Sequence, residues 1–269
     1  MSSIFLAQGG DFIATEHARG PWDPQALHGG AAAALMTAAF ERMQPGAEMP
    51  IARLGFELLR PVPFGPLSLS LSIVRPGRRV QELAGELRCG ERPIVRASAL
   101  RVQRVPTDLP EQPNAQDAWA DRQMPGPQDG APVRFALDDE VDDEQNENSF
   151  AASAMEMRWL SEPRALGPGR VWMRLRHPLL PGQELTPLAR LAAAADFANG
   201  ISATLPFTRF LFINADLTIH LQRNPRGEWI GLDARTLLHG GGSGLSESVL
   251  HDLDGPVGRA FQTLVVQPR

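Results

Sequence analysis

Two alanine-rich stretches constrain this chain more than any other feature. They cover residues 30–43 and 186–200, and each is apolar on nearly every side of a helix. Thr186 can cap the second stretch, Pro187 suits a first helical turn and Gly200 suits a helix end. A helix that is apolar all round must be buried by the structure around it. The sequence therefore predicts two helices, each enclosed by other elements.

Segments with strand-like alternation follow each alanine-rich stretch. Apolar residues alternate there with polar or small ones, and Pro or Gly turns separate the segments. The first set reads IARLGFELLRPV, GPLSLSLSIVRPG, RVQELAGELRCG and RPIVRASALRVQRV, and the second reads INADLTIHLQRNP, EWIGLDARTLLH, SESVLHD and GRAFQTLVVQP. The strands MEMRWL and RVWMRLRH precede the second helix. Each set predicts an antiparallel meander.

The two halves align with each other. GPVGRAFQTLVV aligns with RPIVRASALRVQ, and LTPLARLAAAADFA aligns with LHGGAAAALMTAAF. Asp196 then matches Ala38, and Gln262 matches Ala99. We interpret the chain as a tandem duplication in an α+β fold, with a first unit at residues 1–105 and a second at 150–269. Residues 106–149 are rich in proline and carry the run DDEVDDEQNE, which predicts a partly disordered acidic linker.

Composition excludes several functional classes. The 269 residues carry a net charge of −5, and all 26 basic residues are arginine, so Schiff-base chemistry and a Walker-type phosphate loop are excluded. The arginines are scattered, which argues against nucleic-acid binding. Cys89 is the single cysteine and lies in an expected hairpin turn, so neither a disulfide nor a metal site is expected. We find no secretory signal and no membrane span, and we expect a cytoplasmic protein.

The aligned halves differ where chemistry could occur. The first helix opens with His28-Gly29-Gly30, whose backbone N–H groups could hold a carbonyl oxygen or a developing oxyanion. The second helix lacks the glycines but carries Asp196, a carboxylate in an apolar run. Each half thus retains one component of a site. The alternatives are that the glycines only form a tight turn and that Asp196 faces water.

Two more polar residues interrupt apolar strands. Gln262 lies between Phe261 and Leu264, and Asn214 opens INADLTIHLQ. A carboxylate and two amides can together hold one water by hydrogen bonds. With an oxyanion site opposite, Asp196, Gln262 and Asn214 would suit hydrolysis of an activated acyl group.

The chain resembles the acyl-CoA thioesterase II-like proteins, which have a double hotdog fold. The segments that carry the resemblance are LHGGAAAALM, RLGFELLRPVPFGPL, ADFANG, DLTIHLQRNPRGEWIGLDART and GPVGRAFQTLVVQP. The resemblance implies two long helices, each wrapped by a curved antiparallel sheet, and hydrolysis of acyl-CoA without a metal or cofactor. By position, Asp196 and Gln262 match the family's catalytic residues. Asn214 stands where founding bacterial members have Thr or Ser.

These observations give one leading hypothesis and two alternatives. We expect an acyl-CoA thioesterase in which Asp196 activates water, Gln262 and Asn214 hold it, and the amides of Gly29 and Gly30 polarise the thioester. A non-catalytic acyl-CoA or acyl-carrier binding protein is the first alternative. A hotdog dehydratase or hydratase is the second, and it would require His28 as an acid or base rather than a structural residue at the helix start.

Two expectations concern binding partners. Arginines near the cleft would contact the CoA phosphates, and the candidates are Arg60, Arg75 and Arg78. Open sheet edges and apolar helix faces predict a homodimer or a higher homo-oligomer.

Overall fold

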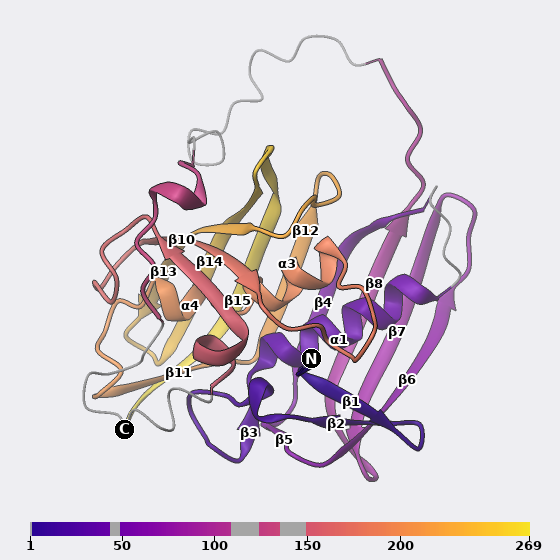
Figure 1. The fold of residues 1–269 in the computed structure, drawn as a ribbon, viewed down its shortest axis with the longest axis horizontal. Helices are drawn as coiled ribbons and strands as arrows, with labels where there is room; N and C mark the ends of the chain where they lie inside the picture. Colours follow the sequence, from indigo (N-terminus) through magenta and orange to yellow (C-terminus); the bar gives the residue numbers. More distant parts are fainter. Residues whose placement is uncertain (1, 44–48, 109–123, 135–148) are drawn as a thin grey trace.

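The computed structural model describes residues 2–43, 49–108, 124–134 and 149–269. Its main feature is one antiparallel sheet of 13 strands that runs through both halves of the chain (Figure 1). The strand order is β1-β2-β6-β7-β8-β4-β12-β15-β14-β13-β10-β9, and β11 pairs separately with β15. The small strands β3 and β5 pair with each other.

The elements of the two halves have the following bounds. The first half contains β1 (Phe5–Gln8), β2 (Asp11–Ala14), β3 (Ala26–Leu27), α1 (Gly29–Arg42), β4 (Ile51–Leu58), β5 (Val62–Pro63), β6 (Pro66–Arg75), β7 (Val80–Cys89) and β8 (Arg92–Val102). The second contains β9 (Met155–Trp159), β10 (Gly169–Leu175), α3 (Pro187–Ala195), α4 (Ala198–Ile201), β11 (Phe210–Asn214), β12 (Asp216–Leu221), β13 (Ile230–His239), β14 (Ser243–Asp252) and β15 (Gly255–Pro268). Short 3₁₀ turns cover Glu16–Ala18 and Pro127–Asp129, and a π-helical turn covers Phe150–Ala154.

The two halves join edge to edge at β4 and β12. Thr218 lies opposite Gly55, and Leu217 lies opposite Phe56. On either side of this seam the strands follow in equivalent order, with β8, β7 and β6 on one side and β15, β14 and β13 on the other. The repeat seen in the sequence is therefore a repeat of topology.

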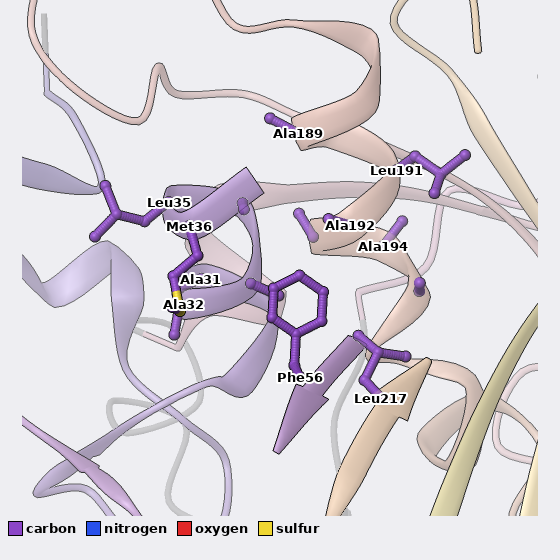
Figure 2. Close-up of a cluster of buried hydrophobic side chains, with 14 of the residues drawn as sticks. Ala31, Ala32, Leu35, Met36, Phe56, Ala189, Leu191, Ala192, Ala194 and Leu217 are labelled. Atoms are coloured by element: carbon purple, nitrogen blue, oxygen red, sulfur yellow. The ribbon is translucent and has the colours of Figure 1, made fainter. Parts of the chain in front are cut away.

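Helices α1 and α3 pack against each other on one face of the sheet (Figure 1). Most of their alanines are buried, whereas Ala38 and Ala39 are half-buried; Ala31, Ala32 and Ala192 have no exposed surface. Figure 2 shows these alanines close to Phe56 and Leu217, the pair at the seam. Small side chains allow two helices to approach closely while a curved sheet covers both, which explains the alanine-rich composition of both stretches.

The expectation of two long helices is only partly correct. Helix α1 has 14 residues, but α3 has nine and ends before Asp196, and a separate four-residue helix follows. The side chain of Gln262 causes the break. Its Nε2 donates to the backbone oxygen of Asp196 (3.1 Å), and its Oε1 accepts from the backbone N–H of Asn199 (3.1 Å). The backbone oxygen of Asp196 and the N–H of Asn199 would otherwise form hydrogen bonds within the helix. Because the Gln262 amide takes both of them, it interrupts the helix.

Part of the predicted linker is bound to the second half. The indole N–H of Trp172 donates to the oxygen of Pro125 (2.6 Å), and that of Trp159 donates to the oxygen of Val133 (3.0 Å). Ala131 also forms a β-bridge with Trp159. Residues 124–134 are thus held by specific hydrogen bonds. The acidic run and most of the predicted linker lie outside the described residues.

Candidate functional site

Asp196 directly follows α3, and its side chain is buried. Its Oδ1 accepts hydrogen bonds from Asn214 Nδ2 (2.6 Å) and Gln262 Nε2 (3.2 Å). Only 6% of Asp196 is exposed, so these two amide donors compensate much of the cost of removing the carboxylate from water. The structure thus brings together the three residues that the sequence singled out from separate segments.

The other oxygen of Asp196 faces the first half of the chain. Oδ2 lies 3.0 Å from Nδ1 of His28, the residue that caps α1. The backbone N–H of Gly30 is also directed at that Nδ1 (3.0 Å). The imidazole stacks on Phe197 at a centroid distance of 4.4 Å and packs against Phe150 at 5.0 Å. His28 and Asp196 therefore form a pair that spans the two halves.

The two glycines after His28 allow this close approach. A Cβ on Gly29 would lie 2.9 Å from Asp196 Oδ2, and a Cβ on Gly30 would lie 2.5 Å from the backbone oxygen of Ala193. Side chains at either position would push the start of α1 away from α3. The N–H of Gly30 is engaged by His28, whereas that of Gly29 has no hydrogen-bond partner among the residues that the structure describes.

A pocket of about 340 Å³ lies over this pair of residues. Its polar lining includes His28, Gly29, Asp196, Asn199 and Asn214. Its apolar walls come from both halves and from the loop before β3; they include Pro21, Trp22, Leu27, Leu58, Leu59, Val62, Phe197 and Ile213. The pocket thus combines a polar floor with apolar walls, as small-molecule sites commonly do.

Gln262 lies outside the pocket, and of the three candidate arginines only Arg60 lines it. Gln262 is completely buried and does not line the pocket; it holds Asp196 from behind. Arg60 does line the pocket, and its Nη1 donates to the backbone oxygen of Pro93 (2.8 Å). Arg75 and Arg78 are exposed and are not part of the pocket lining.

Both halves of the chain match domains of known proteins. Residues 18–102 match an acyl-CoA thioesterase N-terminal domain, and residues 106–266 match an acyl-CoA thioesterase C-terminal domain. The chain belongs to the acyl-CoA thioesterase family. The second match begins inside the segment that we interpreted as a linker.

Solved structures of similar fold cover nearly the whole chain. A provisionally assigned thioesterase from Novosphingobium aromaticivorans has 19% identity and a TM-score of 0.72, with 98% of this chain and 99% of that chain covered. A hot dog protein of unknown function from Alicyclobacillus acidocaldarius has 16% identity and a TM-score of 0.68 (98% and 95% covered). The acyl-CoA thioesterase II TesB2 of Mycobacterium marinum has 18% identity and a TM-score of 0.64 (91% and 92%). At these identities the likeness establishes the hotdog fold alone. No curated protein matches the chain.

Sequence reasoning missed two features of this thioesterase-family site. Asn199 lines the pocket and is 7% exposed, and its position three residues after Asp196 in ADFANG could have indicated that it lies nearby. The sequence led us to expect Asp196 opposite the glycine-rich start of the first helix, but not the direct contact between the His28 and Asp196 side chains. It joins residues 168 positions apart, and no local pattern encodes such a contact.

At the opposite ends of α1 and α3, the position equivalent to the His28–Asp196 pair is occupied by a contact between Thr186 and Glu41. There the Thr186 hydroxyl caps α3 by accepting from the N–H of Ala189 (3.1 Å) and donates to Glu41 Oε2 (2.5 Å). Burial raises the pKa of the Glu41 carboxyl, and the hydrogen bond from Thr186 opposes this shift. The aligned counterpart of Asp196 is Ala38. Among the described residues, the duplicated fold therefore retains one His–Asp pair, at one end of the two helices.

In the described ranges, no group of three or more His, Cys, Asp or Glu side chains could hold a metal ion. Within the same ranges, none of the helices combines the length and apolar character needed to cross a membrane.

Proposed function

We propose that this protein hydrolyses acyl-CoA thioesters to the free acid and CoA, using a water activated at Asp196. The observation that carries the proposal is the position of Asp196. It is a buried carboxylate on the floor of a pocket, held by Asn214 and Gln262 and placed against the glycine-rich start of α1. Membership of the acyl-CoA thioesterase family supplies the substrate class.

The residues divide into distinct roles. Asn214 lines the pocket and has a side-chain oxygen that can accept a hydrogen bond from water. Gln262 fixes the carboxylate without reaching the pocket, so it acts as a positioning residue. The free N–H of Gly29, at the positive end of the α1 dipole, would stabilise the oxyanion that forms from the thioester carbonyl. Loss of one such donor typically lowers kcat by roughly 10²–10³.

The rest of the pocket suits the remaining parts of acyl-CoA. The walls around Trp22, Leu59 and Ile213 are apolar and would contact the acyl chain or the pantetheine arm. Arg60 is the arginine in the lining of this pocket, and its guanidinium would contact a CoA phosphate. Arg75 and Arg78 are not proposed for this role.

A non-catalytic binding protein is the second candidate function. Both oxygens of Asp196 already have partners within the protein, so the carboxylate is satisfied without an ordered water. A protein that only binds acyl-CoA or an acyl carrier would need the pocket and nothing more. The His28–Asp196 pair also fits the acid–base pair of a hydratase, and the assay below includes that reaction.

The test is thiol release from acyl-CoAs with short, medium, long and aryl acyl groups, with the acid product identified by mass spectrometry. An enoyl-CoA is included to detect hydration. The proposal predicts stoichiometric acid and thiol from at least one acyl class. Tight binding without thiol release would support the binding protein, and hydration without thiol release would support the hydratase.

We also propose that the protein forms a homodimer or a higher oligomer. Beyond β1 and β9, the strands at the two ends of the sheet, the described residues add only short contacts, from Phe5 to Leu179 and from Trp159 to Ala131, and no further strand. Light scattering tests this directly. A mass of 29.3 kDa in solution would exclude it.

A further inference from the structure

We propose that His28 is the group that removes the proton from the attacking water. In this proposal Asp196 orients the imidazole of His28 and stabilises the positive charge that the imidazole gains. This inference rests on the proposed thioesterase function and reassigns the base within the same site. The observation behind it is that both carboxylate oxygens of Asp196 have close partners in the protein, and that the imidazole of His28 is the partner of Oδ2.

The contact between the two side chains requires a proton. Nδ1 of His28 lies 3.0 Å from Asp196 Oδ2, and a bare ring nitrogen facing an ionised carboxylate at that distance would be repulsive. The proton is therefore on Nδ1 or on Oδ2. The charge-assisted hydrogen bond that forms when Nδ1 carries the proton is the stronger arrangement. It outweighs the competing N–H of Gly30, which is directed at the same nitrogen.

That arrangement leaves Nε2 as the basic atom. A neutral imidazole with its proton on Nδ1 has a free lone pair on Nε2. Nε2 has no hydrogen-bond partner among the described residues, and it is not one of the fully buried polar atoms that lack one. Since His28 lines the pocket, we infer that Nε2 is accessible to a water there.

A second copy of the same four residues shows what the motif does without the carboxylate. Leu-His-Gly-Gly recurs at residues 238–241, in the hairpin between β13 and β14. There the N–H of Gly241 donates to Nδ1 of His239 (3.1 Å), with the same backbone geometry that Gly30 has toward His28, but His239 is exposed and has no ion pair with any described residue. The local turn is thus a property of the motif. The pairing with Asp196 is specific to His28.

The chemistry balances with these groups alone. Nε2 takes one proton from water as the water oxygen bonds to the thioester carbon, which gives a tetrahedral oxyanion and an imidazolium held by ionised Asp196. The C–S bond then breaks, the carbonyl re-forms, and the imidazolium returns the proton to the leaving sulfur. The products are the carboxylic acid and the CoA thiol.

The test compares His28→Asn with the matched variant His239→Asn. The Asn amide occupies the place of the Cγ–Nδ1 part of the ring, so its Nδ2 can keep the hydrogen bond to Asp196, but it has no atom at Nε2. We expect kcat for the acyl-CoA that the wild type hydrolyses best to fall by roughly 10²–10⁴, with KM changed only a few-fold. The unfolding midpoint of His28→Asn should stay close to that of the wild type, and His239→Asn should match the wild type in both activity and stability.

Each alternative outcome has a distinct meaning. If His28→Asn keeps at least a tenth of the wild-type kcat, His28 is structural and this inference is wrong, while the thioesterase function stands. If His28→Asn is unstable, His28→Gln is measured in its place, because its amide reaches toward the Nε2 position yet is not basic. If the wild type releases no thiol from any acyl-CoA, the proposed function itself fails, and this inference fails with it.

Discussion

At the residue scale, the site consists of polar side chains that form hydrogen bonds with one another. Oδ1 of Asp196 takes two amide donors from the second half, and Oδ2 takes the imidazole from the first. Leaving any of these buried groups unpaired would cost about 1–3 kcal/mol. The glycines after His28 contribute by their lack of a side chain, because the carboxylate and the backbone of α3 occupy the space that a Cβ would need.

Gly30→Ala tests this packing at a single position. The new Cβ would lie 2.5 Å from the backbone oxygen of Ala193, which cannot rotate away. We expect the free energy of unfolding in urea to fall by about 1–3 kcal/mol. Gly241→Ala is the matched control, because its Cβ would meet only the exposed imidazole of His239 at 3.2 Å. Equal stability of the two variants would show that α1 and α3 do not need this close approach.

At the element scale, local patterns predicted most of the structure. The alternating segments form strands, the Cys89 hairpin included, and the first alanine-rich stretch forms α1. The end of the second helix could not be predicted from its own residues. Gln262 lies 66 positions from Asp196, and only the folded sheet brings its amide into the helix ladder. The same limit applies to the pairing of His28 with Asp196.

The hydrogen bond from Thr186, at the start of α3, to Glu41, near the end of α1, gives a prediction about how stability depends on pH. Burial raises the pKa of Glu41, so ionised Glu41 lowers stability above its folded-state pKa, and this cost disappears as the pH falls below its unfolded-state pKa. Glu41→Gln keeps an acceptor for Thr186 and removes the charge. We expect it to be more stable than the wild type at neutral pH, with the difference shrinking toward acidic pH in urea titrations.

Glu162→Gln, the same substitution at an exposed position, provides the control for that series. An advantage of Glu41→Gln that does not change with pH, or that grows as the pH falls, would contradict the assigned cost of burying the carboxylate.

At the scale of the whole molecule, two halves of equivalent strand order share one asymmetric site. The seam between β4 and β12 makes the two halves one continuous sheet, and this brings the start of α1 to the end of α3. At the opposite ends, Thr186 and Glu41 bind each other where a second pair could have been. Each half therefore supplies a group that the other half lacks at its aligned position. Residues 124–134 bind the second half away from the pocket, and none of them lines it.

The measurement that tests the central claim most directly is thiol release by Asp196→Asn beside Asp254→Asn, an exposed control. Asn preserves the shape of the side chain and an oxygen for Asn214 and Gln262, but it can neither take a proton nor stabilise a charged imidazole. We predict that kcat on the preferred acyl-CoA falls by roughly 10²–10⁴ in Asp196→Asn and is unchanged in the control. An Asp196→Asn variant within tenfold of the wild type would show that hydrolysis does not depend on this carboxylate.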